Sequence, residues 1–451
     1  MSDIPAPEAV DPIVLPGATP DRLTDRIAAI ALRERAFLWW WIALIPSGAL
    51  TITLFVAIIY LFYTGIGVWG VTWPGMWGFA ILEYVWWIAI AAGGTFISAL
   101  FYLMRVEWRA AINRIAETMT MFGIACAGLM PILHLGRPYL FYWLYPYPST
   151  MQVWPQFRSP LLWDFVCIQV YLIASGLFWY LGMLPDLAGV RDRAQTRSKQ
   201  VLYGILAMGF RGSGTQWRHF KRTYAVLAAV MAPMICSVHS VVGLDFAGAN
   251  TVGWHSTQYP PFFIFGAFLS GFAMVLLLIV PLRRLMRLER FITGRYLDVM
   301  CRVLLTSSLF LGYSYMMDAF TTYYSADKAE ITMYNARVWT IYSLAYWGKL
   351  FCNILVPQLF WFKRIRTSPV MIILICVTVI FGMWYERYEL VVMSLFRPHL
   401  PSSWGDFSGT VWDYLTLFGT VGFFVFGILL TIRVIPVISM HEVRELMEKR
   451  Q

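Results

Sequence analysis

The feature that most constrains this chain is the recurrence of apolar runs of 20 or so residues along almost its whole length. A helix needs roughly 20 largely apolar residues to cross a bilayer. Such runs lie at residues 38–63, 80–104, 116–136, 160–183, 222–248, 260–282, 299–325, 336–362, 369–388 and 410–435. We therefore predict an all-α, polytopic membrane protein with about ten transmembrane helices.

The composition agrees with a chain built for lipid. Hydrophobic residues make up 59% of the sequence and charged residues only 13%, whereas roughly a quarter of the residues of soluble domains are charged. The first 37 residues contain prolines and charges but no short apolar core before a small-residue cleavage site. We expect a cytoplasmic tail at 1–37, a transmembrane domain at 38–436 and a second cytoplasmic tail at 437–451.

The distribution of basic residues predicts the orientation in the membrane. The net charge of +10 could indicate a nucleic-acid partner, but the basic residues lie in short loops between apolar runs. They accumulate after the second, fourth, sixth and eighth runs and in both tails. Because cytoplasmic loops carry an excess of Lys and Arg, both termini are predicted in the cytoplasm, with membrane lipids and no nucleic acid as partners.

Cysteine and histidine are placed unfavourably for a metal centre. The six cysteines are scattered singly, with no CxxC pair. Two membrane-embedded b-type haems would need four axial histidines, and only His134 and His239 lie in or at the ends of the apolar runs. We predict that this chain binds no metal, haem or iron-sulfur cluster.

The predicted outer loops are unusually aromatic, for example GVWGVTWPGMWG and RPYLFYWLYPYPSTMQVWPQF. Trp and Tyr favour the interface between hydrocarbon and water, so these segments could simply anchor the protein. Proline-rich aromatic loops could equally form a rigid platform for a partner docked outside.

Ionisable residues gather at the outer ends of the predicted helices. An ionisable side chain inside a membrane costs on the order of 2.5–3.5 kcal/mol, so each needs a partner or a task. His134 ends the third run and Asp164 opens the fourth, which brings both to one membrane level. Others at or near this level are Glu83, Arg137, Asp245, His255 and Asp318, whereas His239 and Lys349 lie deeper.

Each of these residues also has a simpler interpretation. Glu83, Arg137 and His255 could merely mark the interface, and Lys349 could extend along its helix to reach polar surroundings. Alternatively, Lys349 pairs with Asp318 or belongs to a proton path. For His134 with Asp164 we favour a functional pair, because a His and a carboxyl group can hold a polar head group and exchange its protons.

An apolar pocket that carries a His and a carboxyl group suits a quinol, a ring that exchanges two protons and bears a long apolar tail. Oxidation near the outer surface would release the protons outside. Since no electron carrier is predicted in this chain, the electrons would leave to a cofactor on a partner docked at the aromatic loops.

Long runs of the sequence are similar to a known family. The segments MTMFGIACAGLMPILHLGRPYLFYWLYPYPS, WPQFRSPLLWDF, SVHSVVGLDFA, GWHSTQYPPFFIFGAFLSGFAMVL, NILVPQLFWFKRIRTSP and LPSSWG, in this order, resemble the NrfD/PsrC-like membrane subunits. More narrowly, they resemble the ActC subunits of the bacterial alternative complex III. The resemblance extends over about residues 75–440.

The resemblance implies two four-helix bundles with flanking helices in a bacterial cytoplasmic membrane. It implies a quinol-oxidising subunit, with menaquinol common among relatives, that works beside a periplasmic iron-sulfur subunit, c-type cytochrome subunits and a paralogous NrfD-like subunit. A soluble cytochrome c or copper protein would be the final acceptor. The quinol-site role falls on His134 and Asp164, with Arg137, Asp245 and His255 near them. Proton translocation would fall on His239, Asp318 and Lys349.

One position departs from the family pattern. Where relatives have a histidine in a GHAGT run, this chain has Ala92 within Ala91-Ala92-Gly93-Gly94-Thr95. A role of that histidine in a proton path is therefore in doubt, and the small residues predict a close helix contact instead.

Two other functions compete with quinol oxidation. A secondary transporter or proton channel would use the same ionisable residues as an ion path, although transporter sites usually lie near the midplane. An inactive scaffold for redox partners is favoured by the missing histidine, but it leaves His134, Asp164 and Asp245 unexplained.

Overall fold

The computed structural model describes residues 19–34, 36–145, 157–254, 256–289 and 291–448. Within these ranges the chain is all-helical, as predicted. The only pairing of the β type among the described residues is a single bridge between Thr72 and Gly75. The helices are α1 (Pro20–Leu32), α2 (Leu38–Thr64), α3 (Phe79–Thr95), α4 (Phe101–Leu103), α5 (Asn113–His134), α6 (Pro160–Arg193), α7 (Arg197–Leu206), α8 (Gly214–Ala247), α9 (Tyr259–Leu285), α10 (Gly294–Ser325), α11 (Lys328–Trp339), α12 (Ser343–Leu350), α13 (Lys363–Arg366), α14 (Pro369–Arg387), α15 (Val411–Val434) and α16 (Met440–Glu448).

Nine helices of the described residues are long and apolar enough to cross a membrane. They match nine of the ten expected runs, and the prediction of a multi-pass membrane protein is confirmed. The remaining run, 336–362, is helical but irregular: α12 continues as a π-helical segment, Phe351–Leu355, and a 3₁₀ segment, Val356–Trp361. Pro357 has no backbone N–H to donate, which favours this break in the α-helical pattern.

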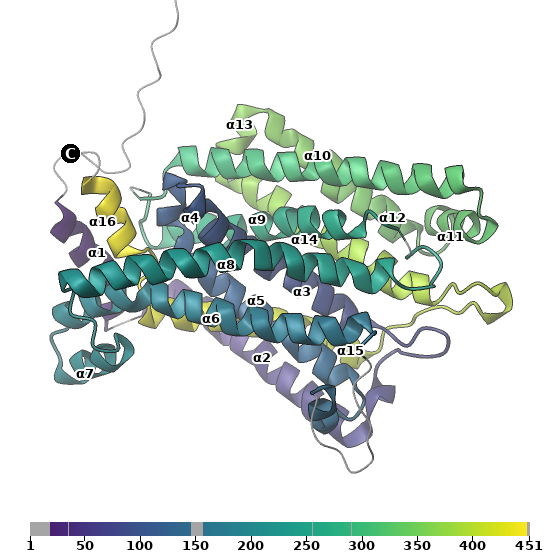
Figure 1. Cartoon of the computed structure of the whole chain (residues 1–451), viewed down its shortest axis with the longest axis horizontal. Helices are drawn as coiled ribbons and strands as arrows, with labels where there is room; N and C mark the ends of the chain where they lie inside the picture. The colour runs from purple at the N-terminus through teal and green to yellow at the C-terminus, as the bar shows by residue number, and fades with distance from the viewer. Residues whose placement is uncertain (1–18, 35, 146–156, 255, 290, 449–451) are drawn as a thin grey trace, which may run out of the picture.

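The long helices pack as two four-helix bundles with two flanking helices (Figure 1). The first bundle contains α3, α5, α6 and α8, and the second contains α9, α10, α14 and the segmented helix that begins with α12. Helices α2 and α15 pack on each other and, through α15, on α5. This is the arrangement that the resemblance implied.

Small residues allow helices to approach closely, both between the two bundles and within the first one. A Cβ atom on Gly93 of α3 would lie 2.2 Å from the Cα of Gly271 in α9, and one on Gly94 would lie 2.2 Å from the carbonyl oxygen of Ala116 in α5. Only glycine fits at such contacts. The close helix contact predicted from the small residues around Ala92 is confirmed.

The two segments expected as cytoplasmic tails contain packed helices in their described parts. Helix α1 contacts α6, α15 and α16, and α16 also contacts α6 and the short segment Glu107–Ala111. Figure 1 places α1, α7 and α16 at one end of the long helices and α11 and α12 at the other. We call the first the basic end and the second the outer end.

Candidate functional site

A large apolar cavity lies in the first bundle toward the outer end. Its volume is about 770 Å³, and its walls come mainly from α3, α5 and α6. Most of the lining side chains are Ile, Leu, Phe or Trp. The polar exceptions are Tyr84, His134, Ser159, Asp164, Gln169 and Asp245, with Tyr145 at the edge. This size and composition are typical of small-molecule sites, which are mostly apolar with a few placed polar groups.

Local helix signals place three of these polar residues at one level. Gly136 adopts φ +73° directly after α5, a conformation that commonly ends helices, so His134 is the last helical residue. Pro160 occupies the first position of α6, which sets Asp164 in the second turn. Asp245 precedes the end of α8 by two residues. The sequence predicted that these residues lie at about the same level, and in the structure all three line one cavity.

Tyr84 of α3 was not among the sequence candidates. Its hydroxyl donates a hydrogen bond to Asp164 Oδ2, and Asp245 of α8 lines the same cavity as Asp164. Tyr84 lies between Ile81 and Val85 on the cavity side of a helix whose sequence is mostly apolar, so no charge signal marked it.

The cavity leaves buried polar atoms without a partner. His134 Nδ1, Asp164 Oδ1 and Asp245 Oδ1 are buried and make no hydrogen bond among the described residues. The ring of Trp77 lies edge-on to His134, with centroids 6.5 Å apart. Buried polar atoms in proteins nearly always have a hydrogen-bond partner. Three such atoms around one apolar cavity are therefore candidate contacts for a ligand.

The other expected members of the site are placed differently. Arg137 is exposed and does not line the cavity. His255 lies outside the described residues. Glu83 of α3 is fully buried against α15, where Thr420 donates a hydrogen bond to it over 3.2 Å. His239 is also fully buried and lies away from the cavity; its Nδ1 is 3.1 Å from the carbonyl oxygen of Ile235.

A second polar cluster lies in the second bundle. Lys349 Nζ is 2.7 Å from Glu389 Oε2, and Arg337 Nη1 is 3.4 Å from Asp318 Oδ2. Lys349 thus finds its carboxylate on the continuation of α14, while Asp318 pairs with Arg337. The cavity between these side chains measures only about 30 Å³, enough for a water and too small for a quinone ring.

Next to this cluster, Arg387 is buried completely at membrane depth. Its Nη1 lies 2.5 Å from Glu386 Oε1, its guanidinium packs over the ring of Phe263 at 4.3 Å, and Tyr315 donates a hydrogen bond to Glu386. Neither Arg387 nor Glu386 was a sequence candidate. The run WYERYE in an otherwise apolar segment was the signal that could have found them.

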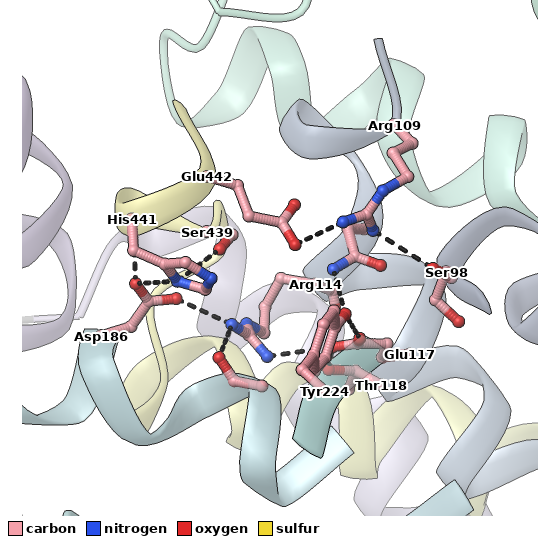
Figure 2. Close-up of polar contacts among 12 residues, drawn as sticks. Ser98, Arg109, Arg114, Glu117, Thr118, Asp186, Tyr224, Ser439, His441 and Glu442 are labelled. Carbon is pink, nitrogen blue, oxygen red and sulfur yellow. Dashed lines mark hydrogen bonds and ion pairs between the residues drawn. The ribbon is translucent and has the colours of Figure 1, made fainter. Parts of the chain in front are cut away.

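A third cluster fills the basic end of the first bundle (Figure 2). Arg114 lies 2.9 Å from Glu117 and 2.7 Å from Asp186, and the Tyr224 hydroxyl is 3.1 Å from Glu117. From α16, His441 reaches Asp186 at 3.2 Å. Arg114 precedes the third apolar run at 116–136, so the sequence placed it among the basic residues of a cytoplasmic loop.

Arg109 extends this cluster toward α16. Its guanidinium pairs with Glu442 and donates to the carbonyl oxygen of Ser98 over 3.2 Å (Figure 2). Burial lowers the pKa of Arg109, but Glu442, Tyr224 and Glu117 together raise that pKa above its usual value. Arg109 therefore stays charged at neutral pH, and its contact with Glu442 holds α16 on the bundle.

No group of three or more His, Cys, Asp or Glu side chains that could hold a metal occurs in the part of the chain that the structure describes.

Comparison with known proteins identifies the family. The family model for the polysulphide reductase NrfD matches residues 67–398. A dimethyl sulfoxide reductase membrane subunit of Halobacterium salinarum is 30% identical over 205 residues, 44% of this chain and 42% of that protein. A selenate reductase subunit of Mesobacillus selenatarsenatis is 27% identical over 215 residues, 45% of this chain and 47% of that protein. The chain thus matches less than half the length of either relative. Because the family match covers well over half of its residues, this chain belongs to the polysulphide reductase NrfD family.

Proposed function

We propose that this chain is the quinol-oxidising membrane subunit of an oxidoreductase complex. The observation that carries the proposal is the apolar cavity of about 770 Å³ with three unpaired polar atoms, on His134, Asp164 and Asp245, around it. A quinol supplies two hydroxyl groups for such atoms and an apolar ring and tail for the walls.

The residues around the cavity can take up what quinol oxidation releases. Conversion of a quinol to a quinone yields two protons and two electrons. In this proposal the Asp164–Asp245 pair accepts one hydroxyl proton, Tyr84 holds Asp164 in place, and His134 Nδ1 accepts the other. The protons leave toward the outer end, and both electrons pass to an iron-sulfur cluster on a partner subunit.

The kind of complex is a finer part of the proposal. The sequence segments favour alternative complex III, with c-type cytochrome subunits, a paralogous NrfD-like subunit and a soluble cytochrome c or copper protein as acceptor. The names of the relatives favour the membrane subunit of a dimethyl sulfoxide or selenate reductase. Menaquinol is the expected quinol in either case. Purification in mild detergent with a count of the subunits and an optical spectrum separates the two, because only the first predicts c-type haem.

Proton translocation would use polar groups of the second bundle and of the contact between the two bundles. Asp318 and Lys349 belong to one buried cluster around a cavity with room for water, and His239 of α8 lies near Arg387 with an unpaired Nε2. A pure transporter or channel is less favoured, because the large cavity is at the outer end and not at the midplane.

Two variants test the proposed site. His134→Ala and Asp164→Asn should each lower quinol oxidation by at least 100-fold, since a positioned acid or base contributes roughly 10²–10⁴-fold. The complex should still assemble. His219→Ala and Asp192→Asn, at exposed positions of the basic end, are matched controls that should keep full activity. Full activity in both site variants would overturn the proposal.

A further inference from the structure

A second sizeable cavity lies at the basic end, far from the quinol site. Its volume is about 450 Å³. The described lining residues on one side are Arg26, Ile27, Ile30, Arg33 and Phe37, and those on the other are Leu285, Met286, Arg287, Leu288 and Phe291. Helix α2 begins at Leu38 and α9 ends at Leu285, so the cavity lies where two spanning helices end. This is the level of the lipid head groups.

The cavity joins an apolar floor to a positively charged rim. Ile30, Phe37 and Phe291 contribute apolar surface, whereas the exposed side chains of Arg26, Arg33 and Arg287 line its edge. Arg26, Ile30 and Arg33 recur at the i, i+4, i+7 spacing of one helix face. None of the described lining residues is acidic: Glu34 and Glu289, although close in sequence, are not among them.

The opposite face of α1 explains why this face remains open. Thr24, Ala28 and Ala31 of α1 are buried, and α1 contacts α6, α15 and α16. The helix is strongly amphipathic, as expected for one that lies in the membrane interface. It is therefore held by its apolar face while the arginines are presented at the cavity.

Arg287 has a left-handed backbone conformation, which glycine adopts at a lower conformational energy. It follows the end of α9 with φ 55°, and the N–H of Leu288 bonds to the carbonyl oxygen of Arg283, the pattern of a helix that ends in a left-handed residue. Such residues are usually Gly. Arg105, Met208 and Ala326 also adopt a positive φ, so the conformation sets where the Arg287 side chain starts and is not itself a sign of binding.

We propose that this cavity binds an anionic phospholipid, with the head-group phosphate between the three arginines and the acyl chains along the apolar floor. Guanidinium groups match phosphate oxygens through paired hydrogen bonds, and basic pockets between membrane helices bind anionic lipids. A lipid is the ligand that combines this charge and this apolar surface at the membrane interface. Bound there, it joins α1 to the end of α9.

The test is native mass spectrometry of the protein, purified in mild detergent with its partner subunits and titrated with phosphatidylglycerol. A triple variant, Arg26→Gln, Arg33→Gln and Arg287→Gln, should weaken binding of the first phosphatidylglycerol on the order of 100-fold. The matched triple variant at Arg22, Arg211 and Arg364, also exposed at the basic end, should bind as the unmodified protein does. A triple Arg→Lys variant at the three cavity positions should regain part of the affinity.

Competition separates the sources of phosphate. Phosphatidylcholine should bind much more weakly, and millimolar inorganic phosphate should not displace phosphatidylglycerol. The proposal is overturned if the cavity variant retains full affinity, if both triple variants lose it equally, or if inorganic phosphate competes effectively. Quinol oxidation serves as the check on folding, because none of the six positions touches the outer cavity.

Discussion

Both ends of the first bundle bury ionisable residues, but these residues surround a cavity at the outer end and form ion pairs at the basic end. At the outer end, His134, Asp164 and Asp245 surround a space and leave one polar atom each without a partner. At the basic end, Arg114 holds Glu117 and Asp186 at 2.9 and 2.7 Å, and α16 closes the cluster. The difference is between polar groups around an open cavity, which suit a ligand, and ion pairs that fill their space and hold α16 on the bundle.

The second bundle lies between these extremes. Its cluster around Lys349, Glu389 and Arg337 is paired, yet it encloses a small cavity with room for water. Such an arrangement suits proton exchange more than ligand binding.

The largest stability effect should come from breaking the basic-end network. Arg114→Met leaves Glu117 and Asp186 buried without their shared cation, so the free energy of unfolding should fall by about 3 kcal/mol. Thermal unfolding of the purified complex measures this. Arg218→Met, at an exposed position of α8, is the control and should change little. An unchanged unfolding temperature for Arg114→Met would show that the network is not structural.

A smaller effect is expected in the second bundle. Lys349→Met should cost about 1–2 kcal/mol, because Arg337 still lies 3.5 Å from Glu389 after the lysine is lost. The double variant Lys349→Met, Glu389→Gln should be no less stable than the single one. If the losses of unfolding free energy caused by Lys349→Met and by Glu389→Gln simply add in the double variant, the two side chains do not interact.

Tyr84→Phe tests the hydrogen bond to Asp164 at the outer cavity. Loss of this bond should reduce kcat of quinol oxidation about tenfold with little change in KM, since a hydrogen bond to a charged group contributes roughly 1.5 kcal/mol. Tyr145→Phe, at the cavity edge, should remain within twofold. A change confined to KM would mean that Tyr84 only binds the substrate.

The smallest effect is expected at Arg137. The side chain is exposed and does not line the cavity, so Arg137→Gln should keep quinol oxidation within about twofold, as surface substitutions usually do. Steady-state assays of the complex measure this. A loss similar to that of Asp164→Asn would return Arg137 to the site.

The sequence was informative where the structure depends on neighbouring residues. It predicted the spans, the close contact at Gly93 and the common level of His134 and Asp164, because each depends on local pattern and loop length. It could not predict Tyr84, which is an ordinary residue of an apolar helix. Nor could it predict that Lys349 faces Glu389, because helix rotation and the π-helical turn after Leu350 decide which faces meet.

The docking of α16 was also beyond sequence reasoning. Its charged residues read as a solvated tail, yet Val443 and Met447 are buried and His441 and Glu442 enter the basic-end network. Tertiary contacts with residues more than 250 positions away made the difference.

The most direct test of the central claim is photolabelling with a reactive quinone analogue, followed by mass spectrometry of the labelled peptides. The account predicts label on the cavity-lining parts of α5 and α6, loss of that label with excess quinol, and strong reduction in His134→Ala. Label confined to α10 and α14 of the second bundle, or label that excess quinol does not displace, would contradict it.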